Sequence, residues 1–536
     1  MVAGVIVWSV VVPQAVAYAQ IAGLPPEAGL IAAPGALVAY ALLGTSRTLV
    51  VSATTATSAI SAAAVTPLAD GDATRFAALS AGLALLSGLI LVGAGLLKLG
   101  GVMDLVSKPV MTGFLFGLGL TVAVGQLPKL FGVEGGSGDF FDLLRALLEN
   151  LGDTSGLTLV VGLGSILLLI ILSRMAPSLP ATLVVLIIAI ATSALFGFAD
   201  RGVDVVGDLP RAIPRPAWPN ITGGDAIGLL GAAFGLMVVS AEAVGVSRSL
   251  ASSDGYVIDA NRDLIAMGGS NLAAGITQGF VQSGGASQTM AAERAGGKTQ
   301  LASLFAAGLI LLTGAFLAPL FKDLPQATLG AIVIVAIAGF FRVDEIRRFA
   351  TLRTSAVVIA LIALGGVLVL GVLPGLIVAA GLSLAMVIKR LSRPPIGTLS
   401  RDPVTGSWGR TDRHPDWQTS DGLVVARVDA QLFYANSTIV KERLLAIARE
   451  QEPKAQALVL DLSTSSDLDV ETVDALGELA DTLAADGIEL RLASVRAPVL
   501  EILRRGGVTS RVRVEPSIDD ALTERPSGPA GGRISG

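Results

Sequence analysis

Long apolar runs without charged residues constrain the fold of this chain more than any other feature. Residues 354–388 contain no Asp, Glu, Lys or Arg, and residues 1–73 contain only four charged side chains. A helix that crosses a bilayer needs about 20 apolar residues, so both stretches are long enough for more than one crossing. Only 15% of all residues are charged, against roughly 25% in soluble domains. The sequence therefore predicts an integral membrane protein.

The apolar blocks predict an α-helical polytopic membrane protein with about fourteen spans. The blocks lie at residues 3–20, 28–43, 49–66, 75–98, 102–126, 156–173, 179–198, 224–246, 262–279, 284–296, 299–321, 324–341, 355–371 and 375–388. Lys and Arg gather at one set of span ends, which favours cytoplasmic termini. We expect a multi-pass protein of the plasma membrane. Residues 52–64 and 285–292 are poor in Leu and rich in small residues, which indicates two half-spanning helices.

Residues 1–391 form the predicted transmembrane domain, and the chain becomes polar beyond it. Residues 392–421 contain charges, prolines and few apolar runs, and we interpret them as a linker. In residues 422–525 strand-like runs alternate with helical patterns, which predicts a small cytoplasmic α/β domain. The predicted strands are 423–430, 457–462 and 490–493, and the predicted helices are 437–450, 470–484 and 497–505. Residues 526–536 are rich in Gly, Pro and Ser and are predicted to be a disordered tail.

Composition excludes several classes of function. The chain has no cysteine and one histidine, His414, which lies in the predicted linker, so we expect no metal site and no cofactor. The sequence contains no phosphate-binding loop and no nucleophile paired with a base, so we do not expect an enzyme. The net charge of −5 provides no basic surface for nucleic acid.

Polar or helix-breaking residues inside an apolar span indicate a protein-lined cavity, because interrupted backbone is tolerated in a membrane only there. Pro13 is expected to break the first span, and Gln14 and Tyr18 lie four residues apart on one helical face. Gln14 either lines such a cavity or bonds to a neighbouring helix, and the residues leave both interpretations open.

The two small-residue segments suggest where an anion can bind. The β-branched residues 48–51 favour an extended segment, and Ser52 or Thr54 can cap a helix that begins inside the membrane. A second such helix is expected to begin near Ser287. If the chain consists of two inverted halves, both positive helix N-termini point at one place and attract an anion. Close packing of small residues between helices is the alternative.

Glu242 is an acidic residue within an apolar span. An ionised carboxylate at that depth costs about 2.5 kcal/mol, so a cation, a bound proton or a water-filled cavity must compensate. Burial favours the neutral acid. We therefore interpret Glu242 as a candidate proton carrier; pairing with Arg248 near the helix end is the alternative.

Four segments together resemble motifs of the sulfate permease (SulP) family of anion transporters. They read VPQAVAYAQIAGLPP, GTSR before a small-residue helix, EAVGVSRSLASSDGYVIDANRDLIAMGGSNLAAG and SGGASQTMAAERAGGKTQL, and they are similar to the first, third, eighth-to-ninth and tenth spans. The C-terminal domain resembles the STAS domain that this family carries. The resemblance implies about fourteen spans as two inverted repeats of seven, a gate domain, a transport core and a homodimer.

The resemblance also implies a set of site residues, because substrate lies between the first, third, eighth and tenth spans in this family. The matching substrate-binding positions are Gln14, Tyr18, Ala53, Thr54, Ala286, Ser287 and Gln288, and Glu242 matches the acidic position of proton-coupled members. Gln288 stands where the family usually has Arg. Two helix N-termini alone offer about one positive charge, so this replacement weakens an assignment to divalent sulfate.

We therefore predict secondary active transport of a small inorganic or carboxylate anion, with sulfate as the first candidate, by H⁺-coupled symport and alternating access. The expected partners are the anion, the proton and the lipid bilayer. Alternatives are a bicarbonate or dicarboxylate transporter, coupling to Na⁺, and a non-transporting sensor that signals through the STAS domain. Val470 occupies the family's usual phosphorylation position, so a STAS role in assembly or docking is at least as well supported as a phosphorylation switch.

Overall fold

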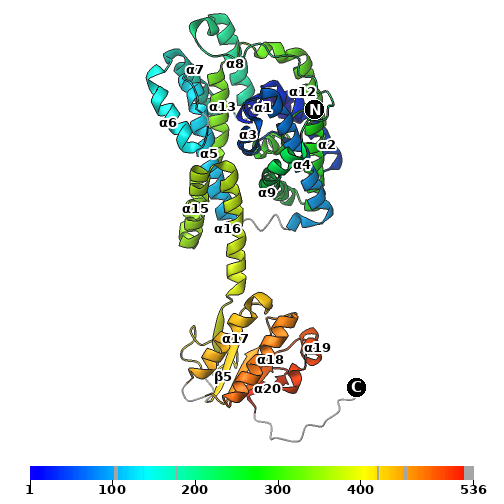
Figure 1. Ribbon diagram of the computed structural model, residues 1–536, viewed down its shortest axis with the longest axis vertical. Helices are drawn as coiled ribbons and strands as arrows, with labels where there is room; N and C mark the ends of the chain where they lie inside the picture. Colours follow the sequence, from blue (N-terminus) through cyan, green and yellow to red (C-terminus); the bar gives the residue numbers. More distant parts are fainter. Residues whose placement is uncertain (102–106, 137, 177–178, 419–421, 452–454, 524–536) are drawn as a thin grey trace. The chain divides into compact units, whose positions relative to one another are not determined.

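The computed structural model describes residues 1–101, 107–136, 138–176, 179–418, 422–451 and 455–523. The chain divides into two compact units, Met1–Leu384 and Ala385–Gly536. The first unit is built mainly of helices, and the second contains a β-sheet covered by helices (Figure 1). Each unit encloses its own cluster of buried hydrophobic residues.

A helix occupies each of the predicted apolar blocks. These helices are α1 (Val2–Ile21), α2 (Glu27–Leu43), α3 (Thr55–Ala69), α4 (Ala73–Leu96), α5 (Lys108–Phe131), α7 (Gly156–Met175), α8 (Ala181–Phe196), α9 (Gly223–Ser253), α10 (Ala260–Ile276), α11 (Ala286–Arg294), α12 (Leu301–Leu312), α13 (Gln326–Ile337), α15 (Thr354–Leu370) and α16 (Val372–Ser392). Two further short helices, α6 (Phe140–Asn150) and α14 (Val343–Leu352), are amphipathic. Within the described residues, eight helical stretches are long and apolar enough to cross a membrane.

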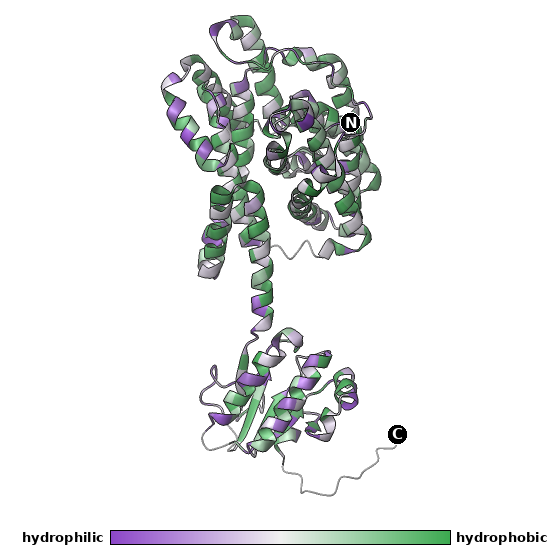
Figure 2. Cartoon of the chain, viewed as in Figure 1, coloured by the Kyte–Doolittle hydropathy of each residue, from purple (hydrophilic) through white to green (hydrophobic). Residues whose placement is uncertain are grey.

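The surface of the first unit suits a hydrocarbon environment. Large aliphatic side chains such as Leu167, Ile187 and Leu361 are more than half exposed. Hydrophobic residues dominate the visible helices of this unit, whereas hydrophobic and hydrophilic residues are mixed in the C-terminal unit (Figure 2). An apolar surface of this extent marks a contact with lipid or protein rather than with water.

The first span is continuous, so the expectation that Pro13 breaks it is wrong. Pro13 lies inside α1, which runs without interruption from Val2 to Ile21. Proline removes one hydrogen bond from the helical ladder. In a membrane protein such a loss is tolerated where neighbouring helices surround the freed backbone group, and α1 is packed against α2, α11 and α12.

The two small-residue segments form the predicted half-helices and meet through a short antiparallel ladder. Strand β1 (Val51–Ser52) precedes α3, and strand β2 (Ser283–Gly284) precedes α11. Val51 is paired with Gly284, and Ser52 is paired with Ser283. The short helices α3 and α11 therefore begin close to each other, although they come from opposite halves of the membrane unit.

The helices of the membrane unit form two packing groups. In one group, α10 packs on α2 and α4, α9 packs on α4, and α12 packs on α1 and α2. In the other group, α5 packs on α7, α13 and α15. The half-helices lie within the first group, and α13 approaches α1 from the second.

The C-terminal unit is an α/β domain with a six-stranded sheet in the order β4-β3-β5-β6-β7-β8. Its elements are β3 (Ile396–Arg401), β4 (Trp408–Arg410), β5 (Leu423–Val428), α17 (Tyr434–Arg449), β6 (Ala457–Asp461), α18 (Val470–Ala485), β7 (Glu489–Ala493), α19 (Ala497–Arg505), β8 (Arg513–Glu515) and α20 (Ile518–Leu522). The strands β5 to β8 are parallel. The predicted strands and helices are present with small shifts at their ends. The predicted tail, residues 526–536, lies outside the described residues.

Part of the predicted linker belongs to this sheet. Residues 392–421 contain β3 and β4, and β3 pairs antiparallel with both β4 and β5. The hydrophobic signal of these strands is weak, because Leu399 is the one buried large apolar residue in β3 and all three residues of β4 are only partly buried. Short strands of this kind gain stability from pairing rather than from an apolar face.

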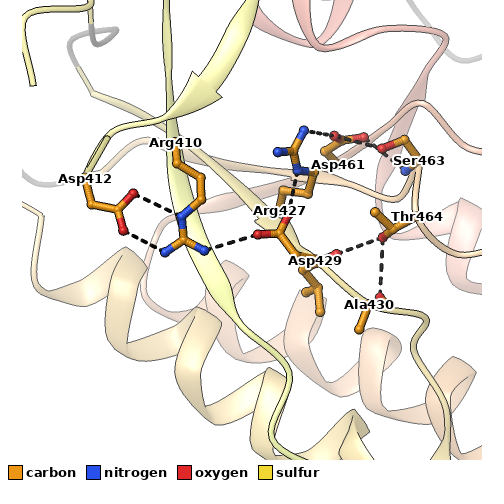
Figure 3. Close-up of polar contacts among 9 residues, drawn as sticks. Arg410, Asp412, Arg427, Asp429, Ala430, Asp461, Ser463 and Thr464 are labelled. Carbon is orange, nitrogen blue, oxygen red and sulfur yellow. Dashed lines mark hydrogen bonds and ion pairs between the residues drawn. The ribbon is translucent and has the colours of Figure 1, made fainter. Parts of the chain in front are cut away.

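A chain of ion pairs fastens β4 to the rest of the sheet (Figure 3). Arg410 on β4 bonds to Asp412, and its Nη1 lies 3.1 Å from Oδ2 of Asp429. Arg427 on β5 in turn donates to Asp429 at 2.9 Å and approaches Asp461 at 4.0 Å. The hydrogen bonds to Asp412 and Asp429 raise the pKa of Arg410 further, so this arginine is charged at every physiological pH.

Candidate functional site

A cavity with a volume of about 280 Å³ lies in the membrane unit at the place where the two half-helices begin. Helices α1, α3, α9 and α11, together with the end of α13 and the segment after it, contribute its walls. The lining residues are Tyr18, Ala53, Thr54, Thr55, Ala56, Val239, Glu242, Val246, Ser283, Gly284, Gly285, Ala286, Ser287, Gln288, Met290, Ala336, Gly339, Phe340 and Arg342. All the predicted site residues except Gln14 are among them.

The N-terminus of α3 is fixed by Thr54, one of the two residues predicted to cap it. Thr54 is the N-cap and has an extended backbone, and its Oγ1 accepts a hydrogen bond from the N–H of Thr57. Oγ1 of Thr57 accepts one from the N–H of Thr54 in return. This reciprocal capping satisfies two backbone groups and leaves the positive end of the helix dipole directed at the cavity.

The N-terminus of α11 is arranged differently. Its N-cap is Gly285, which has no side chain to accept a hydrogen bond from the first turn. The first amide N–H groups of a helix have no partner within the helix. Ala286 and Ser287 provide these groups here, and both residues line the cavity. The uncapped end of α11 is therefore suited to an anionic ligand.

Gln288 joins the two half-helices to α1. Its Nε2 donates to Oε1 of Gln14 at 2.8 Å and to the carbonyl oxygen of Ala53 at 3.2 Å. Its Oε1 accepts a hydrogen bond from Oγ of Ser52 at 2.8 Å. Gln14 is buried behind Gln288 and is not among the lining residues. Of the two interpretations of Gln14, hydrogen bonding to a neighbouring helix is the one that the structure supports.

Glu242 and Arg342 are the charged residues among the described side chains that line the cavity. Glu242 lies well inside α9, which continues to Ser253, and its side chain is 27% exposed. Oε1 of Glu242 lies 3.9 Å from Nη2 of Arg342. The sequence-based alternative named Arg248 as the partner of Glu242, whereas the structure gives an ion pair with Arg342.

Arg342 is the charged residue of the cavity lining that the sequence did not predict. It follows an apolar block and precedes a basic stretch, so its position indicated only a cation at a span end. The structure brings it to the cavity because α13 ends at Ile337, a 3₁₀ turn follows at Ala338–Phe340, and Arg342 then stands at the N-cap position of α14. A bend between two helices cannot be located from hydrophobic periodicity alone.

The fold and the cavity define a class of protein. Half-helices whose positive ends meet at one site inside a many-helix membrane unit are typical of membrane transporters, and the positive ends face anionic groups. A transporter of small anions is therefore the class to which this architecture belongs.

Comparison with known proteins identifies the family. Residues 1–363 match the sulfate permease family, and residues 414–521 match the STAS domain. A probable sulfate transporter of Mycobacterium tuberculosis is 34% identical over 511 residues, which cover 95% of this chain and 91% of that protein. The high affinity sulfate transporter 2 of Stylosanthes hamata is 26% identical over 535 residues, or 95% of this chain and 81% of the relative. The chain belongs to the sulfate permease family.

Solved structures show the same fold. The murine solute carrier 26 family member A9 anion transporter, in an inward-facing state, superimposes with a TM-score of 0.88 at 24% identity, covering 97% of this chain and 90% of that chain. The transmembrane domain of the cyanobacterial bicarbonate transporter BicA gives a TM-score of 0.63 at 24% identity over 71% of this chain and 96% of that chain. The predicted fold class, a helical membrane protein of many apolar helices with a C-terminal STAS domain, is confirmed. The relatives are transporters rather than enzymes.

Proposed function

We propose that this protein transports sulfate across the plasma membrane by H⁺-coupled symport with alternating access. The observation that carries the proposal is that Glu242, the acidic residue of the cavity, shares its walls with the N-termini of α3 and α11. Two helix N-termini attract an anion, and a carboxylate beside them can carry a proton. The sulfate transporters among the relatives support sulfate as the first anion to test.

The residues take separate roles in this proposal. The N–H groups of Ala286 and Ser287 bind the anion. Ala53 and Thr54 precede α3 and place its N-terminus beside the anion. Tyr18 forms the wall of the cavity on the side of α1. Gln288 contributes by holding these segments together, with Gln14 as its partner. A water molecule occupies about 30 Å³ in the liquid, so a cavity of about 280 Å³ accommodates a small anion together with part of its hydration shell.

Both termini are proposed to be cytoplasmic. Lys389 and Arg390 lie in the last turn of α16, and basic residues at span ends favour the cytoplasmic side. In this orientation the STAS domain is cytoplasmic as well.

The test is uptake of labelled sulfate, bicarbonate and fumarate into proteoliposomes that contain the purified full-length protein. Each anion is measured with no gradient, with an inward proton gradient and with an inward Na⁺ gradient. We expect the proton gradient to stimulate sulfate uptake several-fold and the Na⁺ gradient to have no effect.

The other outcomes each remove part of the proposal. Stimulation of bicarbonate or fumarate uptake alone would replace the substrate, and stimulation by Na⁺ alone would replace the coupling ion. Sulfate flux that only equilibrates across the membrane would indicate a channel or exchanger. The absence of any flux from folded, inserted protein would favour a sensor that signals through the STAS domain.

A further inference from the structure

Arg342 is the cation among the described residues that line the cavity, and it comes from a different part of the membrane unit than the half-helices. It lies at the start of α14, after α13, whereas the other polar lining residues lie on or next to α1, α3, α9, β2 and α11. We infer that Arg342 is the residue that neutralises the transported anion, and that Glu242 and the anion compete for it. This inference rests on the proposed function and assigns the charged partner of the substrate.

The contact between Arg342 and Glu242 leaves the guanidinium available. Its Nη2 lies 3.9 Å from Oε1 of Glu242, which is longer than the 2.7–3.2 Å of an N–H···O hydrogen bond. The side chain of Arg342 is 54% exposed, and a guanidinium offers five N–H donors in a planar fork that matches an oxyanion. A small displacement of the Arg342 side chain is enough to exchange its contact with the carboxylate of Glu242 for a contact with an oxygen of the anion.

Two other polar side chains of the cavity, those of Gln288 and Thr54, are already engaged in hydrogen bonds. The amide of Gln288 has partners at both its nitrogen and its oxygen, and the hydroxyl of Thr54 takes part in the capping of α3. Backbone N–H groups at the two helix ends contribute about half a positive charge each. The two helix ends and Arg342 together provide about two positive charges. This total balances a divalent anion such as sulfate, whereas the charge of the helix ends alone does not.

The arrangement links anion binding to protonation of Glu242. The ionised carboxylate attracts Arg342 and repels an anion in the same cavity, and protonation removes both effects. Arg342 and Tyr18 are the other titratable side chains among the described lining residues, and neither provides a second acid. Because such coupling is reciprocal, a proton on Glu242 raises the affinity for the anion, and a bound anion favours the proton.

The test measures sulfate binding to purified full-length protein by isothermal calorimetry at pH 5.5 and pH 8, with proteoliposome uptake in parallel. For the wild type we expect weaker binding at pH 8. For Arg342→Gln we expect affinity to fall by about tenfold to a hundredfold at pH 5.5 and the pH dependence to shrink. Glu242→Gln should bind sulfate tightly at both pH values, because its neutral side chain does not compete for Arg342.

Two further variants complete the experiment. Arg347→Gln removes the same charge from α14 at an exposed position outside the cavity, and it should bind sulfate as the wild type does. Arg342→Lys keeps the charge without the fork, and it should retain most of the pH dependence with weaker binding. If Arg342→Gln does not fold, Arg342→Lys still tests whether the guanidinium of Arg342 binds the anion.

The outcomes separate the inference from the proposed function. Sulfate binding by Arg342→Gln with unchanged affinity and pH dependence would overturn the inference and leave the transport proposal standing. A wild-type protein that neither binds nor transports sulfate would overturn the transport proposal itself, and the assignment of Arg342 with it.

Discussion

At the scale of single residues, Gln288 has the most connected position in the site. One buried amide bonds to Gln14 on α1, to Ser52 on β1 and to the backbone of Ala53. A buried polar group without its partner costs about 1–3 kcal/mol, so each of these contacts matters for stability. The neutral amide of Gln288 thus holds the half-helices and α1 together.

We expect Gln288→Leu to lower thermal stability because it leaves buried polar atoms of Gln14 and Ser52 without a partner. The expected loss is about 1–3 kcal/mol. The double variant Gln14→Leu with Gln288→Leu should lose less than the sum of the single variants, since it removes both ends of one hydrogen bond. Thermal unfolding of the detergent-solubilised proteins measures this coupling, and strict additivity would argue against the contact.

Glu242→Gln should uncouple transport from the proton gradient while the protein remains folded. The amide has nearly the shape of the carboxylic acid, but it does not exchange a proton with the cavity. We expect proteoliposome uptake of sulfate to proceed without stimulation by an inward proton gradient. Asp344→Asn changes the same charge at a fully exposed position and serves as the control. A normal response to the gradient in Glu242→Gln would remove this residue from the coupling mechanism.

The sequence predicts much of the cavity lining, because polar and charged residues are unusual inside an apolar span. Thr54 and Ser287 lie at helix N-termini inside apolar blocks, and Glu242 is a carboxylate within one. Arg342 is an ordinary cation at the end of a span, so the sequence does not distinguish it from the other basic residues there. Its position beside the cavity depends on the bend after α13. The orientation of Gln14 toward Gln288 likewise depends on a contact between residues 274 positions apart.

At the scale of elements, small residues set how closely the helices approach. A Cβ atom added at Gly29 of α2 would overlap the backbone carbonyl group of Ala15 on α1. The absence of a side chain at Gly29 therefore allows α1 and α2 to lie in direct backbone contact. This close packing is the device by which membrane helices associate.

We expect Gly29→Ala to destabilise the membrane unit by about 1–3 kcal/mol, because the added methyl group forces α1 and α2 apart. Gly231→Ala in α9 is the matched control, since a Cβ there meets no atom within 4 Å. Alanine favours a helix more than glycine does, so the control should be as stable as the wild type or slightly more stable. Size-exclusion chromatography after graded heating measures the temperature at which each variant aggregates. Equal temperatures for the two variants would contradict the packing argument.

Helix α18 of the C-terminal unit depends on an ionised cap. Burial raises the pKa of Asp469, but hydrogen bonds from the Thr472 hydroxyl and from the N–H groups of Tyr434 and Thr472 outweigh it, so the pKa lies below its usual value of 3.8. A carboxylate whose pKa is lower in the folded state stabilises that state above the unfolded pKa and loses the effect as the pH falls through the folded pKa.

Asp469→Ala should therefore lower the free energy of unfolding of a fragment of residues 385–523 by about 1 kcal/mol at pH 7. The difference from the wild-type fragment should shrink as the pH falls below 3.8. Urea unfolding across this pH range measures it. Asp474→Ala, at an exposed position of the same helix, should have little effect at any pH, and a constant deficit of Asp469→Ala would show that ionisation is not the cause.

At the scale of the whole molecule, the sheet of the C-terminal unit begins at Ile396, inside the segment that the sequence predicts as a linker. The C-terminal unit begins at Ala385, and β3 and β4 complete its sheet beside β5. The apolar blocks were predictable because each helix needs its own hydrophobic stretch. The two strands were not predictable, because β3 and β4 are short and lack an alternating apolar face.

A fragment of residues 385–523 should be more stable than a fragment of residues 422–523. The shorter fragment leaves the backbone of β5 as an unpaired edge and removes the ion pairs of Arg410. We expect a lower melting temperature by circular dichroism and a tendency to self-associate. Equal melting temperatures of two monomeric fragments would mean that β3 and β4 contribute nothing to the fold.

The pairing of β1 with β2 has a consequence for biosynthesis. Val50 and Thr289, which are joined by a hydrogen bond, are 239 positions apart in the chain. Chains are made at about 5–20 residues per second, so α3 emerges on the order of ten seconds or more before its partner segment. During that interval an incomplete ladder and a helix end without its counterpart lie in the bilayer. The first half of the protein thus has no complete binding site until the second half is made. A membrane chaperone or a quality-control protease can recognise the incomplete protein during this interval.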